Sequence, residues 1–248
     1  MKPLDRQAVF DFVNVEIVHF HNARLDRLAR ISLSEVLRKK NPYLFRAKNM
    51  LSAGDLVRAI LDAFLSSSEE KLFGDFLESL AIFVSGQTCD GKKSTAEGLD
   101  LEFDHEGVRY LVSIKSGPNW GNSSQVRRLE DNFKRAVIVQ RQSQSRLTIQ
   151  PVLGICYGRA ATRDRGAYLR IMGQSFWYLL SGDPDLYLDI IEPIGHRAKE
   201  HNDAFAEARA ALENRFTQEL IDSFCDESYR IDWPRLVAFN SGNLPTNG

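Results

Sequence analysis

The stretch GLDLEFDHEGVRYLVSIKSGPNWGN, residues 98–122, decides the fold. From 99 to 104, leucines and a phenylalanine alternate with acidic residues, which is the two-residue period of a β-strand. The polar residues 104–107 then predict a turn, and VRYLVSIKS predicts a second strand that returns beside the first. The sequence therefore predicts a hairpin that carries a carboxylate, Asp100, on one strand and an ammonium, Lys115, on the other.

These two charges invite two interpretations. Because strand side chains alternate, Lys115 shares a face with Ser113, and Asp100 lies on the face opposite Leu99 and Leu101. The carboxylate and the lysine can then meet at the ends of paired strands. Exposed faces of antiparallel strands also carry such pairs in contact with water, so spacing alone leaves a solvated face as the alternative.

Around the hairpin the patterns are mainly helical. Apolar residues at helical spacing predict helices over 9–31, 32–40, 52–67, 66–86, 125–142, 174–183 and 193–225. Ser67 with Glu70 predicts a capping box that opens a separate helix. A third strand is expected over 147–158, followed by a basic loop at 159–166.

The composition is that of an ordinary globular protein. The chain has 248 residues, of which 43% are hydrophobic and 26% charged. It contains no repeat and no linker that forces a division, so we expect one domain over 1–240. Its parts are an N-terminal helical part at 1–66, a core at 67–192, C-terminal helices at 193–240 and a disordered tail at 241–248.

Several classes of protein are disfavoured. No apolar run approaches the ~20 residues of a membrane span, and the N-terminus has no apolar signal-peptide segment, so we expect a cytoplasmic protein without a membrane partner. Cys89, Cys156 and Cys225 are far apart and odd in number, which fits neither a zinc spacing nor a disulfide framework. The net charge of −1 gives no global attraction to nucleic acid but leaves room for locally arranged charge.

A wider pattern surrounds the hairpin. Glu78 lies in the upstream helix, after Gly74; Asp100 and a hydrophobic strand ending in Lys115 follow, and then come the polar loop SGPNWGNSSQ and another helix. In this order the chain resembles the PD-(D/E)xK nucleases, and among them the type II restriction endonucleases. The resemblance is most specific across 73–122 and continues through VLGICYGR, GQSFWYLLSGD and NPYLFRAKN.

The resemblance implies an α/β, restriction-endonuclease-like core, with a central mixed sheet flanked by helices and additional N- and C-terminal helices. It also implies a catalytic site. Asp100 and Glu78 match the family's metal-binding carboxylates, Lys115 matches its lysine, and the backbone carbonyl of Ile114 would be a further ligand to Mg²⁺.

The sequence departs from the family pattern at Ser113, which takes the catalytic position where the family usually has Asp or Glu. One metal-binding acid is therefore missing from the strand. We expect Glu78 to replace it from the helix. Glu102, two residues after Asp100, is the alternative, either solvated or supporting a second cation.

Two clusters are expected to bind DNA, because Asn and Gln pair with adenine and Arg with guanine. The first follows the catalytic lysine and comprises Asn119, Asn122, Ser123, Ser124, Gln125 and Arg127. The second lies in the basic loop and comprises Arg159, Arg163 and Arg165. Turn formation by Asn and Ser, and plain solvation of a basic loop, remain as structural alternatives.

The resemblance thus predicts a Mg²⁺-dependent homodimer that cuts both strands of a short palindromic sequence in double-stranded DNA, with a DNA methyltransferase as its genetic partner. Two alternatives stay open. One is a sequence-specific or structural DNA-binding protein on the same fold, its active site impaired at Ser113. The other is a nonspecific repair or mobile-element nuclease.

Overall fold

The structure, a computed structural model, describes residues 1–142 and 147–243 and divides the chain into two compact units. The first unit comprises residues 1–18 and 73–196, and the second comprises residues 19–72 and 197–248. The long helices α1 (Arg6–Arg30) and α4 (Ala53–Cys89) each contribute residues to both units. Residues 244–248 of the predicted disordered tail lie outside the described residues.

The first unit is built on a mixed six-stranded sheet of order β1-β2-β3-β4-β6-β5, which confirms the predicted fold class. Its strands are β1 (Lys92–Lys93), β2 (Leu101–His105), β3 (Val108–Lys115), β4 (Thr148–Ile155), β5 (Arg163–Asp164) and β6 (Leu169–Met172). Strand β2 pairs antiparallel with β3, whereas β3, β4 and β6 run parallel. The carboxyl ends of these three parallel strands therefore meet along one edge of the sheet.

The predicted hairpin is present, with two differences. Its turn is Glu106-Gly107, whose positive φ angles of 48° and 77° suit a tight two-residue connection. The first strand begins at Leu101 rather than at Leu99. Leu99 packs in the core on the α5 side of the sheet, whereas Leu101 packs on the opposite side. The expectation that Leu99 and Leu101 share a face was wrong, because the alternation is broken in the segment that enters β2.

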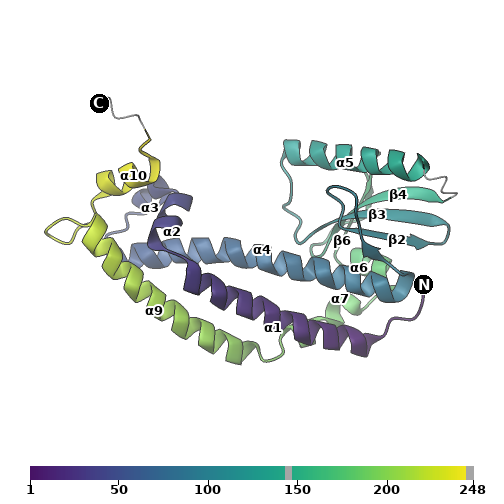
Figure 1. The fold of residues 1–248 in the computed structure, drawn as a ribbon, viewed down its shortest axis with the longest axis horizontal. Coiled ribbons are helices and arrows are strands. Elements are labelled where there is room, and N and C mark those ends of the chain that lie inside the picture. Colours follow the sequence, from purple (N-terminus) through teal and green to yellow (C-terminus); the bar gives the residue numbers. More distant parts are fainter. Residues whose placement is uncertain (143–146, 244–248) are drawn as a thin grey trace. The chain divides into compact units, whose positions relative to one another are not determined.

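Helices cover both faces of this sheet (Figure 1). Helix α5 (Ser123–Gln142) packs Leu129 and Phe133 against Leu111 and Leu153 of the strands. The second half of α4 and helix α6 (Gln174–Ser181) cover the other face. The short helices α7 (Leu186–Asp189) and α8 (Ile191–Ile194) follow α6. Strand β3 is thus buried from both sides along 111–114, as expected of a central strand.

Helix α4 replaces two predicted helices. It runs unbroken for 37 residues, and Ser67 does not cap a new helix, because its Oγ donates to the Ala63 carbonyl one turn earlier at 3.0 Å. No proline interrupts the segment, and apolar residues continue at helical spacing past the three serines. Ser52 caps the start of α4 by accepting from Asp55 N at 3.4 Å.

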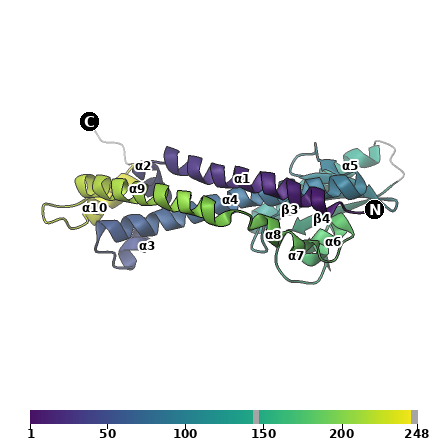
Figure 2. The same cartoon turned by 90° about the horizontal axis from the view of Figure 1, so that it is seen from below.

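The second unit is helical. Besides its parts of α1 and α4, it contains α2 (Leu33–Lys39), α3 (Pro42–Ala47), α9 (Ala198–Phe224) and α10 (Trp233–Ser241). Figure 2 shows α10 beside α9, and its Leu236 enters a core with Leu56, Leu61 and Phe216. The short elements α3, α7, α8, β1, β5 and β6 were not predicted individually, whereas α10 falls almost entirely in the range 193–240 over which C-terminal helices were expected. In the described part of the chain, no helix is long and apolar enough to cross a membrane.

Candidate active site

Asp100 lies just before β2 and is fixed to the neighbouring strand. Its backbone N donates to the Val112 carbonyl at 2.9 Å. Its carboxylate Oδ2 accepts hydrogen bonds from Ile114 N at 2.5 Å and from Ser113 Oγ at 3.2 Å. Asp100 Oδ1 accepts no hydrogen bond from any residue that the structure describes. One oxygen of the carboxylate is therefore anchored, and the other remains available to a ligand.

The glycine two residues earlier allows this placement. Gly98 has a φ of +74°, and a Cβ there would lie 1.8 Å from Asn132 Nδ2 of α5. A side chain at this position of positive φ would require Asn132 or the segment entering β2 to move. Gly98 thus fixes how the chain enters the Asp100 position.

Lys115, the last residue of β3, points into the site. Its Nζ donates to the Ile114 carbonyl at 2.7 Å and lies 3.6 Å from Asp100 Oδ2. The ammonium also lies 5.5 Å from the centroid of the Trp120 ring. With 25% of its side chain exposed, Lys115 is half-buried among these groups rather than directed to bulk water.

Glu78 approaches from α4. A Cβ on Gly74 would lie only 3.6 Å from Ser116, so this helix packs closely on the segment that follows β3. Glu78 is one turn further along the same helix face. Burial raises the pKa of the Glu78 carboxyl, and the nearby Asp100 carboxylate raises it further, while Lys93 and Lys115 oppose the shift. The two acids therefore repel each other across a shared space, which a cation would relieve.

Cys156 and Trp120 belong to this neighbourhood but were not predicted as site residues. Cys156 directly follows β4, and its N donates to the Lys115 carbonyl at 2.9 Å. Burial, together with the charge of Glu78, raises the pKa of its thiol to about 12, so the thiol stays protonated at neutral pH. The sequence signals, a cysteine at a strand end and a tryptophan in a polar loop, were too common to single out either residue.

The oxygen atoms of this site fit a hard divalent cation. Mg²⁺ takes carboxylate and carbonyl oxygens and keeps several water ligands, so two carboxylates and one carbonyl suffice. Asp100, Glu78 and the Ile114 carbonyl are the oxygens that could supply that set. The described residues contain no group of three or more His, Cys, Asp or Glu side chains arranged to hold a metal, in keeping with the serine at position 113.

The structure does not bring Glu102 into this cluster. Its Oε1 accepts from Ser94 Oγ at 2.5 Å, and its strand neighbour is Lys92 of β1. Glu78, by contrast, is within electrostatic reach of Asp100 and Lys115.

The first predicted DNA-binding cluster contains a structural cap. Asn122 Oδ1 accepts from Gln125 N at 3.0 Å and from Ser124 Oγ at 2.7 Å, while Asn122 N donates to Gln125 Oε1 at 2.9 Å. These three residues therefore stabilise the start of α5. Asn119, Ser123 and Arg127 are exposed.

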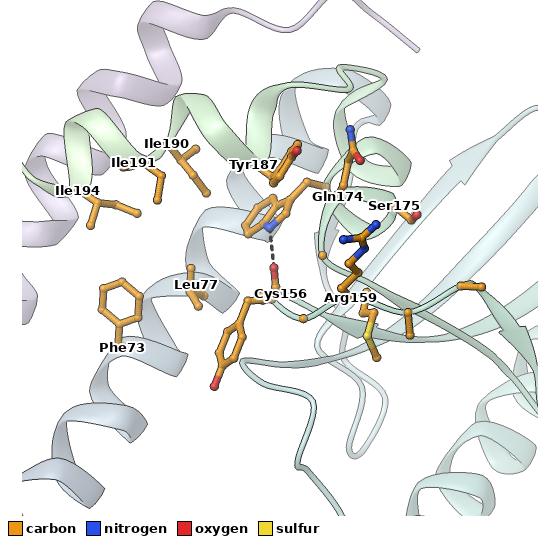
Figure 3. Close-up of a pocket in the computed structure, with 17 residues that line it drawn as sticks. Phe73, Leu77, Cys156, Arg159, Gln174, Ser175, Tyr187, Ile190, Ile191 and Ile194 are labelled. Carbon is orange, nitrogen blue, oxygen red and sulfur yellow. Dashed lines mark hydrogen bonds between the residues drawn. The ribbon is translucent and has the colours of Figure 1, made fainter.

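The predicted arginine cluster is divided. Arg159, Arg163 and Arg165 are all exposed, but Arg163 lies in β5 and only Arg159 lines a cavity of about 1090 Å³ at the carboxyl ends of β4 and β6. Figure 3 shows Arg159 on the same side of this cavity as Gln174 and Ser175, across from an apolar wall. The apolar wall includes Phe73, Leu77, Ile190, Ile191 and Ile194. Because Leu77 and Cys156 also line it, the cavity adjoins the Glu78 and Lys115 site.

A mixed sheet between helices, with a carboxylate and a lysine converging at the end of its central hairpin and an acid from the flanking helix, defines a nuclease of the restriction-endonuclease-like class. The family model of type II restriction endonuclease EcoO109I matches residues 7–202, and the chain belongs to this family. No curated protein matches the chain.

Proposed function

We propose that this restriction endonuclease hydrolyses both strands of double-stranded DNA at a short specific sequence and requires Mg²⁺. The observation that carries the proposal is the convergence of Asp100, Glu78 and Lys115 at the end of β3. Family membership indicates the class of reaction, and these three residues would bind the cation and stabilise the transition state.

Asp100, Glu78 and the Ile114 carbonyl would hold the cation. Bound Mg²⁺ would lower the pKa of water and neutralise charge on the phosphoryl oxygens. The protein positions these oxygens in advance, because Ile114 N and Ser113 Oγ both anchor Asp100 Oδ2. Ser113 is therefore a positioning residue, which acts on the reaction through Asp100.

Lys115 is the residue that meets the developing charge. In hydrolysis, a water oxygen forms a new bond to phosphorus, the bond from phosphorus to the leaving nucleoside oxygen breaks, and that oxygen gains a proton. The Lys115 ammonium, held close to Asp100, can orient the water and stabilise the additional negative charge of the transition state. Its half-buried position strengthens this effect relative to a lysine in bulk water.

The DNA contacts are assigned to both predicted clusters. Asn119, Ser123 and Arg127 are exposed and would contact the phosphate backbone beside the lysine, because the start of α5 favours anionic groups. Arg159, Arg163 and Arg165 are the candidates for guanine recognition. A homodimer would present two such sites to a palindromic sequence, and a DNA methyltransferase would protect the host copy of that sequence.

Ser113 favours one other function, DNA binding without turnover, because the strand lacks its usual acid. Digestion of phage DNA with purified protein and Mg²⁺ separates the possibilities. Discrete bands are expected, and they should disappear in an Asp100→Asn variant. Uncut but shifted DNA would instead assign the chain to the binding function, and a smear would assign it to nonspecific cleavage.

A further inference from the structure

A second cavity, of about 540 Å³, lies on the α5 side of the sheet in the first unit. We name it the Trp120 cavity. Its lining includes the apolar Leu153 of β4 and the aromatic residues Trp120 and Tyr168. Tyr168 is buried and held by Phe133, with ring centroids 5.7 Å apart. Fixed aromatic rings together with an apolar side chain suit a flat, conjugated ligand.

Charged groups also line the Trp120 cavity. They are Glu130 of α5, Arg165 and Arg170. Arg170 Nη2 donates to the Pro118 carbonyl at 3.3 Å, which ties β6 to the loop that carries Trp120. Among the described residues, neither the Glu130 carboxylate nor the Arg165 guanidinium makes a hydrogen bond or an ion pair with another side chain. Two positive groups and one negative group therefore line one cavity.

This combination selects among ligands. A phosphate would pair with the arginines but would leave the Glu130 carboxylate without a donor, and a purely apolar ligand would leave all the charged groups without a partner on the ligand. A nucleobase has a flat ring for the aromatic side chains and an edge with donors and acceptors. Guanine uses both charges, because its O6 and N7 accept from arginine and its amino group donates to a carboxylate.

The position of the Trp120 cavity indicates where such a base would come from. The ring of Trp120, which lines the cavity, lies 5.5 Å from Lys115 Nζ. Bases along one DNA strand are separated by about 3.4 Å, so a base in this cavity would lie within a few steps of the phosphate that is cut. A base inside a duplex cannot be enclosed in this way unless it leaves the stack.

We propose that the Trp120 cavity binds a guanine base extruded from the bound duplex, next to the cleavage position. This assignment rests on the proposed function, since it takes the duplex at Lys115 as its source of the base. Trp120 and Tyr168 provide the stacking surface, and Arg165 with Glu130 reads the edge of the base.

The test is a mismatch scan across the cleavage sequence, mapped first by digestion. Each guanine is kept, its partner base is changed, and affinity is measured with Ca²⁺ in place of Mg²⁺. For bases read inside the duplex, a mismatch weakens binding. For an extruded guanine, the mismatch removes part of the cost of unpairing, so affinity should rise roughly tenfold at that position alone.

Variants assign the effect to the cavity. Glu130→Gln and Arg165→Ala should abolish the rise in affinity. Asp131→Asn and Arg141→Ala are the matched controls, because both side chains are exposed on α5 outside the cavity, and both variants should retain the rise.

The outcomes separate this proposal from the one on which it rests. If the protein cleaves at a defined sequence and every mismatch weakens binding, the proposal of base extrusion is wrong and the proposed nuclease function still holds. Saturable binding of free dGMP that depends on Glu130, without any mismatch effect, would also overturn it by assigning the cavity to a free nucleotide. If the protein neither cuts nor binds any DNA, both proposals fail.

Discussion

Lys115 Nζ lies 3.6 Å from Asp100 Oδ2, with 25% and 20% of the two side chains exposed. The pair is therefore half-buried, and it does not belong to a solvated strand face. Because Lys115 also donates to the Ile114 carbonyl, its ammonium contacts one of the oxygens proposed to hold the cation. Binding of the proposed cation by the Ile114 carbonyl would therefore require Lys115 to turn away from that oxygen toward the substrate.

Removal of the lysine should separate catalysis from binding. We expect Lys115→Ala to lower the cleavage rate by about 10²–10³-fold, the usual cost of losing one group that stabilises transition-state charge. DNA affinity with Ca²⁺ should stay within a few-fold of wild type, since Asp100 and Glu78 remain. Lys134→Ala, an exposed lysine on α5, is the control and should cut normally. A parallel loss of affinity and rate would show that Lys115 serves binding instead.

Whether Glu78 supplies the second metal-binding carboxylate can be tested by moving that carboxylate to position 113. Glu78→Gln should lower the cleavage rate by about 10²-fold or more and raise the Mg²⁺ concentration required, because it removes one of two carboxylates. Ser113 bonds Asp100, so an acid at that position would enter the same site. We therefore expect Ser113→Glu to restore part of the activity of Glu78→Gln.

The control for this rescue is Ser113→Gln in the same background. Glutamine has the same size as glutamate but no charge, so it should not restore activity. Equal rescue by both residues would mean that bulk at position 113 matters and would count against Glu78 as the migrated acid.

The sequence predicts those parts of the fold that depend on local patterns. The hairpin follows from alternation and a glycine in the turn, and it brings the segments that carry Asp100 and Lys115 side by side. The order of a helix acid, a strand acid and a lysine then points to the family. Glu78 was predicted as a partner of Asp100 for that reason, and the structure places it within electrostatic reach.

Features set by distant contacts were not predictable. The break before β2 depends on Gly98 meeting Asn132 of α5, which lies 34 positions further along the chain. Strand β6 has only four residues and exists through its pairing with β4. The contact of Trp120 with Lys115 likewise depends on the conformation of the loop after β3, which no periodicity in the sequence predicts.

Gly98 should be far more sensitive to substitution than another glycine of positive φ. In Gly98→Ala the new Cβ would lie 1.8 Å from Asn132 Nδ2, so Asn132 or the strand entry must move. At Gly107, with a φ of +77°, a new Cβ would meet nothing within 4 Å, so Gly107→Ala would show only the backbone cost of about 1 kcal/mol. We expect Gly98→Ala to cost more than Gly107→Ala in urea unfolding and also to reduce cleavage by displacing Asp100. Equal losses of stability would contradict the role of the close approach.

Salt dependence should distinguish phosphate contacts from base contacts. Arg127 is exposed at the start of α5. Arg127→Ala should therefore lower the affinity for all DNA sequences by a similar factor and reduce the slope of log affinity against log salt by about 1. Arg159 lines the larger cavity, and Arg159→Ala should instead relax specificity at one base pair, by about 1–3 kcal/mol. Affinities for cognate and altered duplexes at several salt concentrations provide both quantities. If the two variants behave alike, the division between the clusters is wrong.

The second unit should lose stability in mild acid because of one buried histidine. His21 is only 6% exposed, stacks on His201 with ring centroids 4.4 Å apart, and lies 3.2 Å from Arg24 Nη1 through its Nδ1. Burial lowers its pKa to about 4, and the charges of His201 and Arg24 act in the same direction. An unfolded histidine titrates near 6.5, so between these values the unfolded chain binds the additional proton. The stabilisation is complete above pH 6.5 and is lost as the pH falls toward 4, by about 3 kcal/mol in total.

Urea unfolding between pH 7.5 and pH 4.5 measures this loss. His21→Gln keeps an oxygen that can accept from Arg24 but removes the titrating group, so its free energy of unfolding should fall less steeply with acid than that of wild type. Carboxylates that titrate in the same range act equally in both proteins, and the difference between the two curves therefore isolates His21. Curves that stay parallel throughout would show that His21 takes up its proton without opening the stack on His201.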